Sequence, residues 1–307
     1  MKCIAISALL LFSGCGHADD SDIRSELRAE SAKFGLAIAA GVSNRIVIIP
    51  FDGSERYFKT EHTRQLKLFG ASGSMVLWLY RPSFLESSQF FIDSIRGERI
   101  ADIHPRVSEF SPVALSEASR RLAFLGRSYG KDKPNGLHWA AFNFSRVNFV
   151  AQADGNCDWS PDGNALVYEN KGQIYIFDVA SSSSRRLTRG HDPAWSPNGK
   201  WIAFRSVDER ASLVSIEGKS VNWAVGTHNP TSPIRWSPDG RYVSFSEAIP
   251  SLQIPFITAD YGVSVSRISD GQSIIVKKFG AYGTSSFFWI IDYRSFCGGC
   301  MPGTPFN

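Results

Sequence analysis

The chain of 307 residues lacks the local signatures that mark most enzyme active sites. It contains no Gly-x-Ser-x-Gly nucleophile elbow, no Walker phosphate-binding loop and no His-Glu-x-x-His zinc helix. It also has no cluster of Lys and Arg interleaved with aromatic residues, and its net charge is only +4, so nothing indicates nucleic acid as a partner. A non-catalytic role is therefore favoured over an enzymatic one, and we expect neither a cofactor nor a metal.

Cysteine is scarce, with five in the chain, two of them near the N-terminus. Cys157 is expected to be a buried thiol beside Trp159. Cys297 and Cys300 have the spacing of a redox motif, but they lie in a Pro- and Gly-containing tail, residues 294–307, rather than at the start of a helix. In an oxidising compartment this pair is expected to form a small structural disulfide.

Long apolar runs are also absent. The run from Ile4 to Phe12 is too short to span a bilayer as a helix. Because Lys2 precedes it and small residues follow it, residues 1–18 are interpreted as an export or lipoprotein signal.

Two processing sites are compatible with this signal. The segment Leu11-Phe12-Ser13-Gly14-Cys15 resembles a bacterial lipobox, in which Cys15 would be lipidated. The alternative is cleavage after Ala18. We favour lipidation because Cys15 directly follows Ser-Gly. Both routes place the protein in the bacterial periplasm or cell envelope, and the first attaches it to a membrane by a lipid.

The chain does contain one local pattern in six copies. Three copies are plain: Trp159-Ser-Pro-Asp-Gly163, Trp195-Ser-Pro-Asn-Gly199 and Trp236-Ser-Pro-Asp-Gly240. Three are degenerate: Phe69 to Gly73, Leu115 to Ser119 and Phe279 to Gly283. The first residues of the copies, here called anchors, recur every 36 to 46 residues. This period fits one four-stranded propeller blade per copy.

The physical chemistry of one copy predicts a hairpin. Pro presets the backbone of a tight turn, Asp or Asn tolerates the next position, and Gly accepts a left-handed conformation. Apolar and aromatic residues follow, as in Trp201-Ile-Ala-Phe204, and favour a strand. The anchors Trp159, Trp195 and Trp236 are expected to fill the wedges between neighbouring sheets.

The chain ends indicate how a ring would close. After the anchor at Phe279 the sequence has room for two strands, within residues 282–293. Before the first anchor, residues 45–51 and 55–58 read as an unassigned hairpin. We expect this hairpin to complete the last blade, giving a six-bladed β-propeller over residues 45–293 with both chain ends in the sixth blade.

These copies resemble the WD40-like repeats of the TolB C-terminal domain and of prolyl-oligopeptidase propellers. The resemblance covers about residues 45–293, and it implies an all-β propeller fold. TolB itself carries a further N-terminal α/β domain, for which this sequence has no space. Residues 19–44 are expected to form a tether or a short helix starting near Ser21, with Ile23, Leu27 and Phe34 on its inner face.

Three histidines each precede an anchor: His104, His191, which is followed by Asp192, and His228. In a propeller, such connections gather at one mouth of the central channel, so these residues are candidate binding residues. Their unequal distances from the anchors argue against convergence on a metal. Asp154-x-Asn156-x-Asp158 begins like a calcium loop but lacks its Gly and its final Glu, and is interpreted as a turn.

Three function classes remain. The favoured one is an envelope propeller that binds a protein or peptide through its channel mouth and loops. The alternatives are a metal-dependent lyase or hydrolase acting on a polysaccharide, and a small-ligand-binding propeller.

Overall fold

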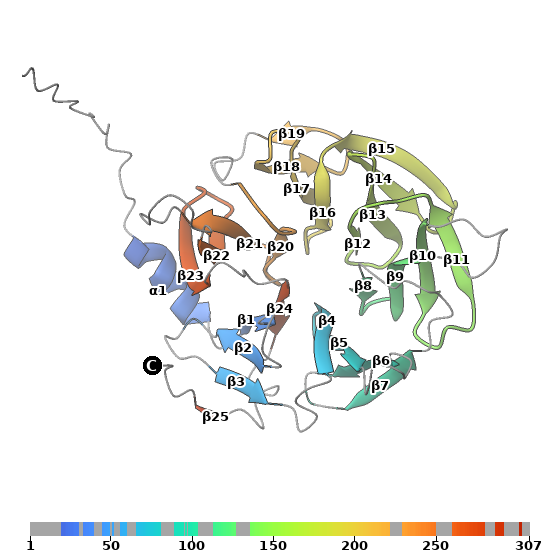
Figure 1. Cartoon of the computed structure of the whole chain (residues 1–307). Helices are drawn as coiled ribbons and strands as arrows, with labels where there is room; N and C mark the ends of the chain where they lie inside the picture. The colour runs from blue at the N-terminus through green and yellow to red at the C-terminus, as the bar shows by residue number, and fades with distance from the viewer. Residues whose placement is uncertain are drawn as a thin grey trace, which may run out of the picture.

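Antiparallel β-sheets stand around a common centre and form a β-propeller (Figure 1). The computed structural model describes residues 20–30, 33–39, 45–49, 51, 56–59, 66–80, 89–94, 96, 98–103, 113–126, 136–221, 229–249, 260–279, 286–291 and 301–302. Five sheets have four strands each, in simple chain order from an inner strand to an outer one. The expected all-β propeller is thus confirmed.

The five four-stranded sheets follow one another along the chain. The first contains β4 (Leu66–Ser72), β5 (Met75–Tyr80), β6 (Gln89–Ser94) and β7 (Arg99–Ile103). The second contains β8 (Val113–Ser116), β9 (Arg121–Gly126), β10 (Gly136–Ala141) and β11 (Val147–Ala151). The third contains β12 (Cys157–Trp159), β13 (Ala165–Asn170), β14 (Gln173–Asp178) and β15 (Ser183–Arg189). The fourth contains β16 (His191–Trp195), β17 (Trp201–Arg205), β18 (Ala211–Ser215) and β19 (Ser220–Val221). The fifth contains β20 (Arg235–Trp236), β21 (Tyr242–Ile249), β22 (Asp260–Arg267) and β23 (Ser273–Phe279).

Turns of sequence Ser-Pro-Asp-Gly or Ser-Pro-Asn-Gly join the inner strands β12, β16 and β20 to the strands that follow them. Ser160 donates its hydroxyl to Asp162 at 2.6 Å and accepts the backbone N–H of Ala165 at 2.8 Å. Gly163 adopts φ of 70°, the left-handed conformation that the turn requires. Asn198 takes the place of Asp162 in the next sheet and accepts the equivalent hydroxyl at 2.8 Å. The turn chemistry read from the sequence is therefore what folds these hairpins.

Five anchors lie on inner strands, at or just before the turn. They are Phe69 in β4, Leu115 in β8, Trp159 in β12, Trp195 in β16 and Trp236 in β20. Trp159 and Trp195 are buried, with 4% and 8% of their surface exposed, and Trp236 is partly buried. That these tryptophans fill the wedges between sheets stays a prediction.

A five-stranded sheet joins the two ends of the chain. Its order is β24 (Ser286–Ile291), β1 (Phe34–Ala39), β2 (Arg45–Ile49), β3 (Arg56–Lys59) and β25 (Met301–Pro302). β24 contacts the inner strands β20 and β4, and therefore stands among the inner strands.

The composition of this sheet differs from the expectation. The hairpin near residues 45–58 exists as β2 and β3, but β1 lies between β2 and β24. A strand at Phe34–Ala39 was not expected, because its Gly and Ala residues have low β-propensity. Six four-stranded blades were also wrong as a count: five sheets have four strands, and this sheet has five.

The sixth anchor was placed wrongly as well. Phe279 ends β23, the outer strand of the fifth sheet, so it does not open a new inner strand. Trp289 in β24 takes the anchor role, since its indole N–H donates to the carbonyl of Arg235 in β20 at 3.2 Å. Counting an equal period from Trp236 missed it because the chain there is longer than in the other repeats.

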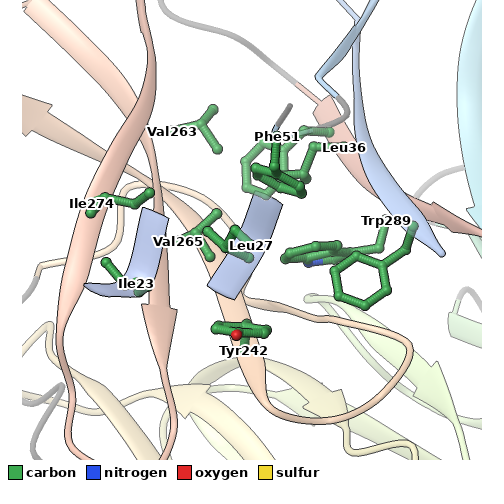
Figure 2. Close-up of a cluster of buried hydrophobic side chains, with 11 residues drawn as sticks. Ile23, Leu27, Leu36, Phe51, Tyr242, Val263, Val265, Ile274 and Trp289 are labelled. Atoms are coloured by element: carbon green, nitrogen blue, oxygen red, sulfur yellow. The ribbon is translucent and has the colours of Figure 1, made fainter. Parts of the chain in front are cut away.

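Helix α1 (Asp20–Glu30) packs against the outside of the ring beside β23 (Figure 1). Ile23 and Leu27 are each 1% exposed and join a cluster with Val265, Ile274 and other apolar side chains (Figure 2). The helix ends before Phe34, which is buried within β1 instead of on the helix.

Polar contacts hold the same helix. Arg267 of β22 pairs with Glu26 at 2.8 Å and with Asp22 at 3.1 Å, and Tyr242 donates its hydroxyl to Glu26 at 2.8 Å. Within the described residues, no helix combines the length and the apolar character needed to cross a membrane.

Candidate functional site

A cavity of about 550 Å³ lies where the inner strands reach their turns. Residues of β4, β8, β12, β16, β20 and β24, or of the turns that follow them, line it. These inner strands surround the centre of the ring (Figure 1). The cavity is thus one mouth of the central channel, and its volume is in the range of ligand pockets.

The wall of this cavity combines aromatic and charged groups. Its aromatic residues are Trp159, Trp195, Trp236, Phe288 and Trp289. Its charged residues are Glu117, Asp158 and Arg235. Aromatic walls with a few convergent charges are typical of sites that bind part of another molecule.

Asp158 of β12 is fixed by two backbone donors. One carboxylate oxygen accepts the N–H of Trp159 at 2.9 Å, and the other accepts the N–H of Trp195, in the neighbouring sheet, at 2.8 Å. Burial raises the pKa of Asp158, and this effect exceeds the opposing effects of Arg235 and the two N–H donors. Asp158 therefore links two sheets and also places a carboxyl group in the channel wall.

Arg235 of β20 lies at the same level of the channel. The centre of its guanidinium stands 5.3 Å from the centroid of the Phe288 ring, a cation–π arrangement. Glu117 instead points to the rim, where it accepts the N–H of Ser74 at 3.0 Å and the Ser74 hydroxyl at 2.5 Å.

A second polar network lies at the opposite end of β16. Nδ1 of His191 lies 2.7 Å from one oxygen of Glu169, whose other oxygen accepts the N–H of Asp192 at 3.0 Å. The carboxylate of Asp192 accepts hydrogen bonds from Asn156 and from Arg205, the latter at 3.1 Å. All of these groups are satisfied by one another, as a structural network requires.

Three comparisons relate this chain to known proteins. No protein-family model matches it. An uncharacterized protein, Atu1656, of Agrobacterium fabrum (strain C58) is 35% identical over 74 residues, which cover 20% of this chain and 25% of that protein. The match therefore spans a quarter of the relative's length.

Solved structures match much more of the chain. A structure assigned as TolB from Agrobacterium tumefaciens aligns with a TM-score of 0.51 at 18% identity, covering 67% of this chain and 78% of that one. TolB from Acinetobacter baumannii aligns with a TM-score of 0.55 at 15% identity, covering 84% and 66%. The fold is that of a TolB-like β-propeller. At these identities the likeness concerns the fold alone.

The sequence-predicted binding residues are only partly placed in this TolB-like propeller. His191 and Asp192 lie in the network around Glu169, and His191 begins the inner strand β16 instead of lying in the connection before it. His104 and His228 lie outside the described residues. Within the described parts of the chain, no three His, Cys, Asp or Glu side chains are grouped so as to hold a metal.

Of the cysteines singled out in the sequence, one lies within the described residues. Cys157 is a buried free thiol in one apolar cluster with Trp159, as expected. Burial raises the pKa of this thiol. Cys15, Cys297 and Cys300 lie outside the described residues.

The calcium-like segment is engaged in three separate places. Asp154 accepts the N–H of Lys171 at 2.9 Å, Asn156 donates to Asp192, and Asp158 faces the channel.

Sequence reasoning missed Asp158 and Arg235 as channel residues. Each directly precedes an anchor tryptophan, Trp159 or Trp236. Since neighbouring strand residues point to opposite faces of a sheet, the residue before an anchor lies on the other face from the anchor, and a charged residue there is unusual enough to notice. That position was the available signal.

Proposed function

We propose that this TolB-like propeller is a non-catalytic binding module of the bacterial cell envelope. Its partner is a protein or peptide, part of which enters the mouth of the channel lined by the six inner strands. The partner is not a nucleic acid, because the cavity wall carries a single arginine and no cluster of basic residues.

One observation carries this proposal: the cavity of about 550 Å³ combines five aromatic side chains with a cation on a rigid wall. Aromatic residues and arginine are the side chains that contribute most to protein interfaces. Because every inner strand contributes residues to the wall, the site is formed by the arrangement of the sheets around it, and little reorganisation opposes binding.

Photo-crosslinking tests the proposal. Position 118 is exposed and lies in the cavity lining. A photoreactive aromatic amino acid placed there should capture one envelope protein. That protein is then purified, and the dissociation constant of its complex with the propeller is measured. The same group at position 186, on the exposed outer strand β15, is the control. Equal capture at both positions, or none at position 118, would contradict binding at the channel mouth.

The proposed envelope location rests on the N-terminal sequence and on the TolB-like fold. Lipidation of Cys15 would leave only four residues between the lipid and α1, which begins at Asp20. The propeller would then lie close to the membrane surface. Metabolic labelling with a fatty acid should mark the wild type and not Cys15→Ala, and a mature N-terminus at Asp19 would support cleavage after Ala18 instead.

We also propose that the five-stranded sheet acts as the sixth blade and closes the ring. In its support, the inner strands make contacts in the cyclic order β4, β8, β12, β16, β20, β24 and back to β4. Deleting residues 1–58 should remove α1, β1, β2 and most of β3, and should abolish cooperative melting. A truncated chain that melts sharply near the wild-type temperature would refute this closure.

In the tail, we propose a disulfide between Cys297 and Cys300, which peptide mapping without reduction would detect.

A further inference from the structure

Arg235 occupies a distinctive place in the channel wall. The residues that directly precede the other anchors on the inner strands, where their side chains are described, are Ala114, Asp158, Ala194 and Phe288. Of these four, Asp158, Ala194 and Phe288 line the cavity, whereas Ala114 is buried in one cluster with Trp159. With Arg235, this level of the wall presents one cation, one acid, one ring and one small side chain. Because alanine leaves space, the guanidinium of Arg235 is not walled off from the cavity.

The main chain of Arg235 is held firmly. Its carbonyl accepts the indole N–H of Trp289 at 3.2 Å and the hydroxyl of Ser244 at 3.5 Å. The guanidinium, in contrast, makes no hydrogen bond or ion pair with any residue that the structure describes, and its recorded contact is with the Phe288 ring. Contact with a ring engages the planar face of a guanidinium and leaves its five N–H donors unused.

Asp158 does not supply the missing acceptor. Its two oxygens each accept a backbone N–H, from Trp159 and from Trp195, and no ion pair joins it to Arg235. Arg235 is partly buried, and its guanidinium faces a cavity large enough to admit part of a ligand. A planar guanidinium has the geometry to donate two parallel hydrogen bonds to a carboxylate. A carboxylate that enters the cavity would therefore find unused donors there.

We propose that Arg235 binds a carboxylate of the partner polypeptide, while the adjoining part of the ligand packs on the Trp236, Phe288 and Trp289 side of the cavity. This inference rests on the proposed function, and it names the chemical group that the channel mouth recognises. The carboxylate comes from an acidic side chain or from the C-terminus of the partner, and the two sources are separable by experiment.

The probes are two synthetic octapeptide libraries, one with free C-terminal carboxylates and one with amides. Peptides retained by the full-length protein are identified, resynthesised as matched pairs that differ only as Glu and Gln or as acid and amide, and their dissociation constants are measured. We expect the acid form to bind about tenfold or more tightly than its neutral counterpart, the size of one charge-assisted contact. The pair that shows this ratio identifies the source of the carboxylate.

Three variants complete the test. In Arg235→Gln the ratio should fall to about one, and in Arg235→Lys it should fall only in part, because lysine keeps the charge but loses the bidentate geometry. In the control Arg186→Gln, on the exposed strand β15, the ratio should not change. Melting temperatures establish that each variant folds.

The possible failures are distinct. If peptides bind the wild type without any acid preference, or if the preference survives in Arg235→Gln, the role of Arg235 is refuted while the binding function stands. If the wild type retains no peptide and no partner, the proposed function itself fails, and the role of Arg235 fails with it.

Discussion

The indole N–H of Trp159 donates to the backbone carbonyl of Ala114 at a distance of 3.2 Å, across the boundary between two sheets. Trp236 does the same toward Ala194 at 3.1 Å, and Trp289 toward Arg235 at 3.2 Å. These three tryptophans thus each join an inner strand to the inner strand before it.

This relationship predicts different costs for two substitutions of one residue. Trp159→Ala should lower the free energy of unfolding by about 3–5 kcal/mol through a cavity. Trp159→Phe keeps most of the apolar volume but leaves the Ala114 carbonyl without its donor, which should cost about 1–3 kcal/mol. Chemical denaturation measures both losses, provided that the slope of unfolding free energy against denaturant concentration is unchanged.

Trp195→Phe serves as the comparison. Trp195 donates within its own turn, to the carbonyl of Gly199 at 3.2 Å. Loss of this hydrogen bond affects a turn and not a boundary between sheets. The decrease in unfolding free energy should therefore be smaller than for Trp159→Phe. A larger cost, or near-neutral effects at both positions, would refute the role given to the indole of Trp159.

The sequence predicted the hairpins of the middle sheets well because their chemistry is local. A serine, a proline, an Asp or Asn and a glycine determine the turn by themselves, so β12 with β13 and β16 with β17 were read correctly from Trp159 and Trp195. The five-stranded sheet that joins the two chain ends could not be predicted in this way. β1 pairs with β24, and Leu36 lies opposite Trp289, through contacts between residues far apart in the chain.

The channel site was harder to predict for a related reason. Arg235 matters because it lies beside Phe288 and because Ala194, another residue of the cavity wall, is small. None of these neighbours is close to it in sequence. The histidines, by contrast, were conspicuous in the sequence, yet His191 is engaged with Glu169 inside a structural network.

Helix α1 should be an integral part of the folded ring. Leu27→Ala and Ile23→Ala each remove a fully buried side chain and should cost about 2–4 kcal/mol in unfolding free energy (Figure 2). The control is Arg28→Ala, on the exposed side of the helix, which should stay within about 0.5 kcal/mol. Equal, negligible effects at all three positions would mean that the helix does not pack on the propeller in solution.

The network at the far end of β16 makes a separate prediction. Glu169→Ala removes the carboxylate that contacts His191 and accepts the Asp192 N–H, and Asp192 lies in the left-handed region at a φ of 53°. The expected loss is about 1–3 kcal/mol of stability. Glu209→Ala, which removes an exposed partner of Arg205, should change stability by less than about 1 kcal/mol.

Asp158 should make stability depend on pH in a direction opposite to that of most carboxylates. Burial raises its pKa in the folded state above the ordinary value of 3.8, so the folded protein holds this proton more tightly than the unfolded chain does. Its contribution is therefore fully present below the unfolded pKa and is lost as pH rises through the folded pKa.

Asp158→Asn tests this contribution by denaturation at several pH values. The amide has one acceptor oxygen in place of two, so one backbone N–H, of Trp159 or of Trp195, loses its partner at every pH, at a cost of about 1–3 kcal/mol. The wild type loses stability as its carboxyl ionises, whereas the variant has no carboxyl there to ionise. The difference in unfolding free energy between wild type and variant should therefore shrink from pH 4.5 to pH 7.5. Asp162→Asn is the control, because the Ser160 hydroxyl holds the pKa of Asp162 below 3.8, and the corresponding difference should stay flat over this range. If the difference instead widens with pH for Asp158→Asn, the buried carboxyl is stabilised as an anion. The lowering of its pKa by Arg235 would then exceed the raising by burial.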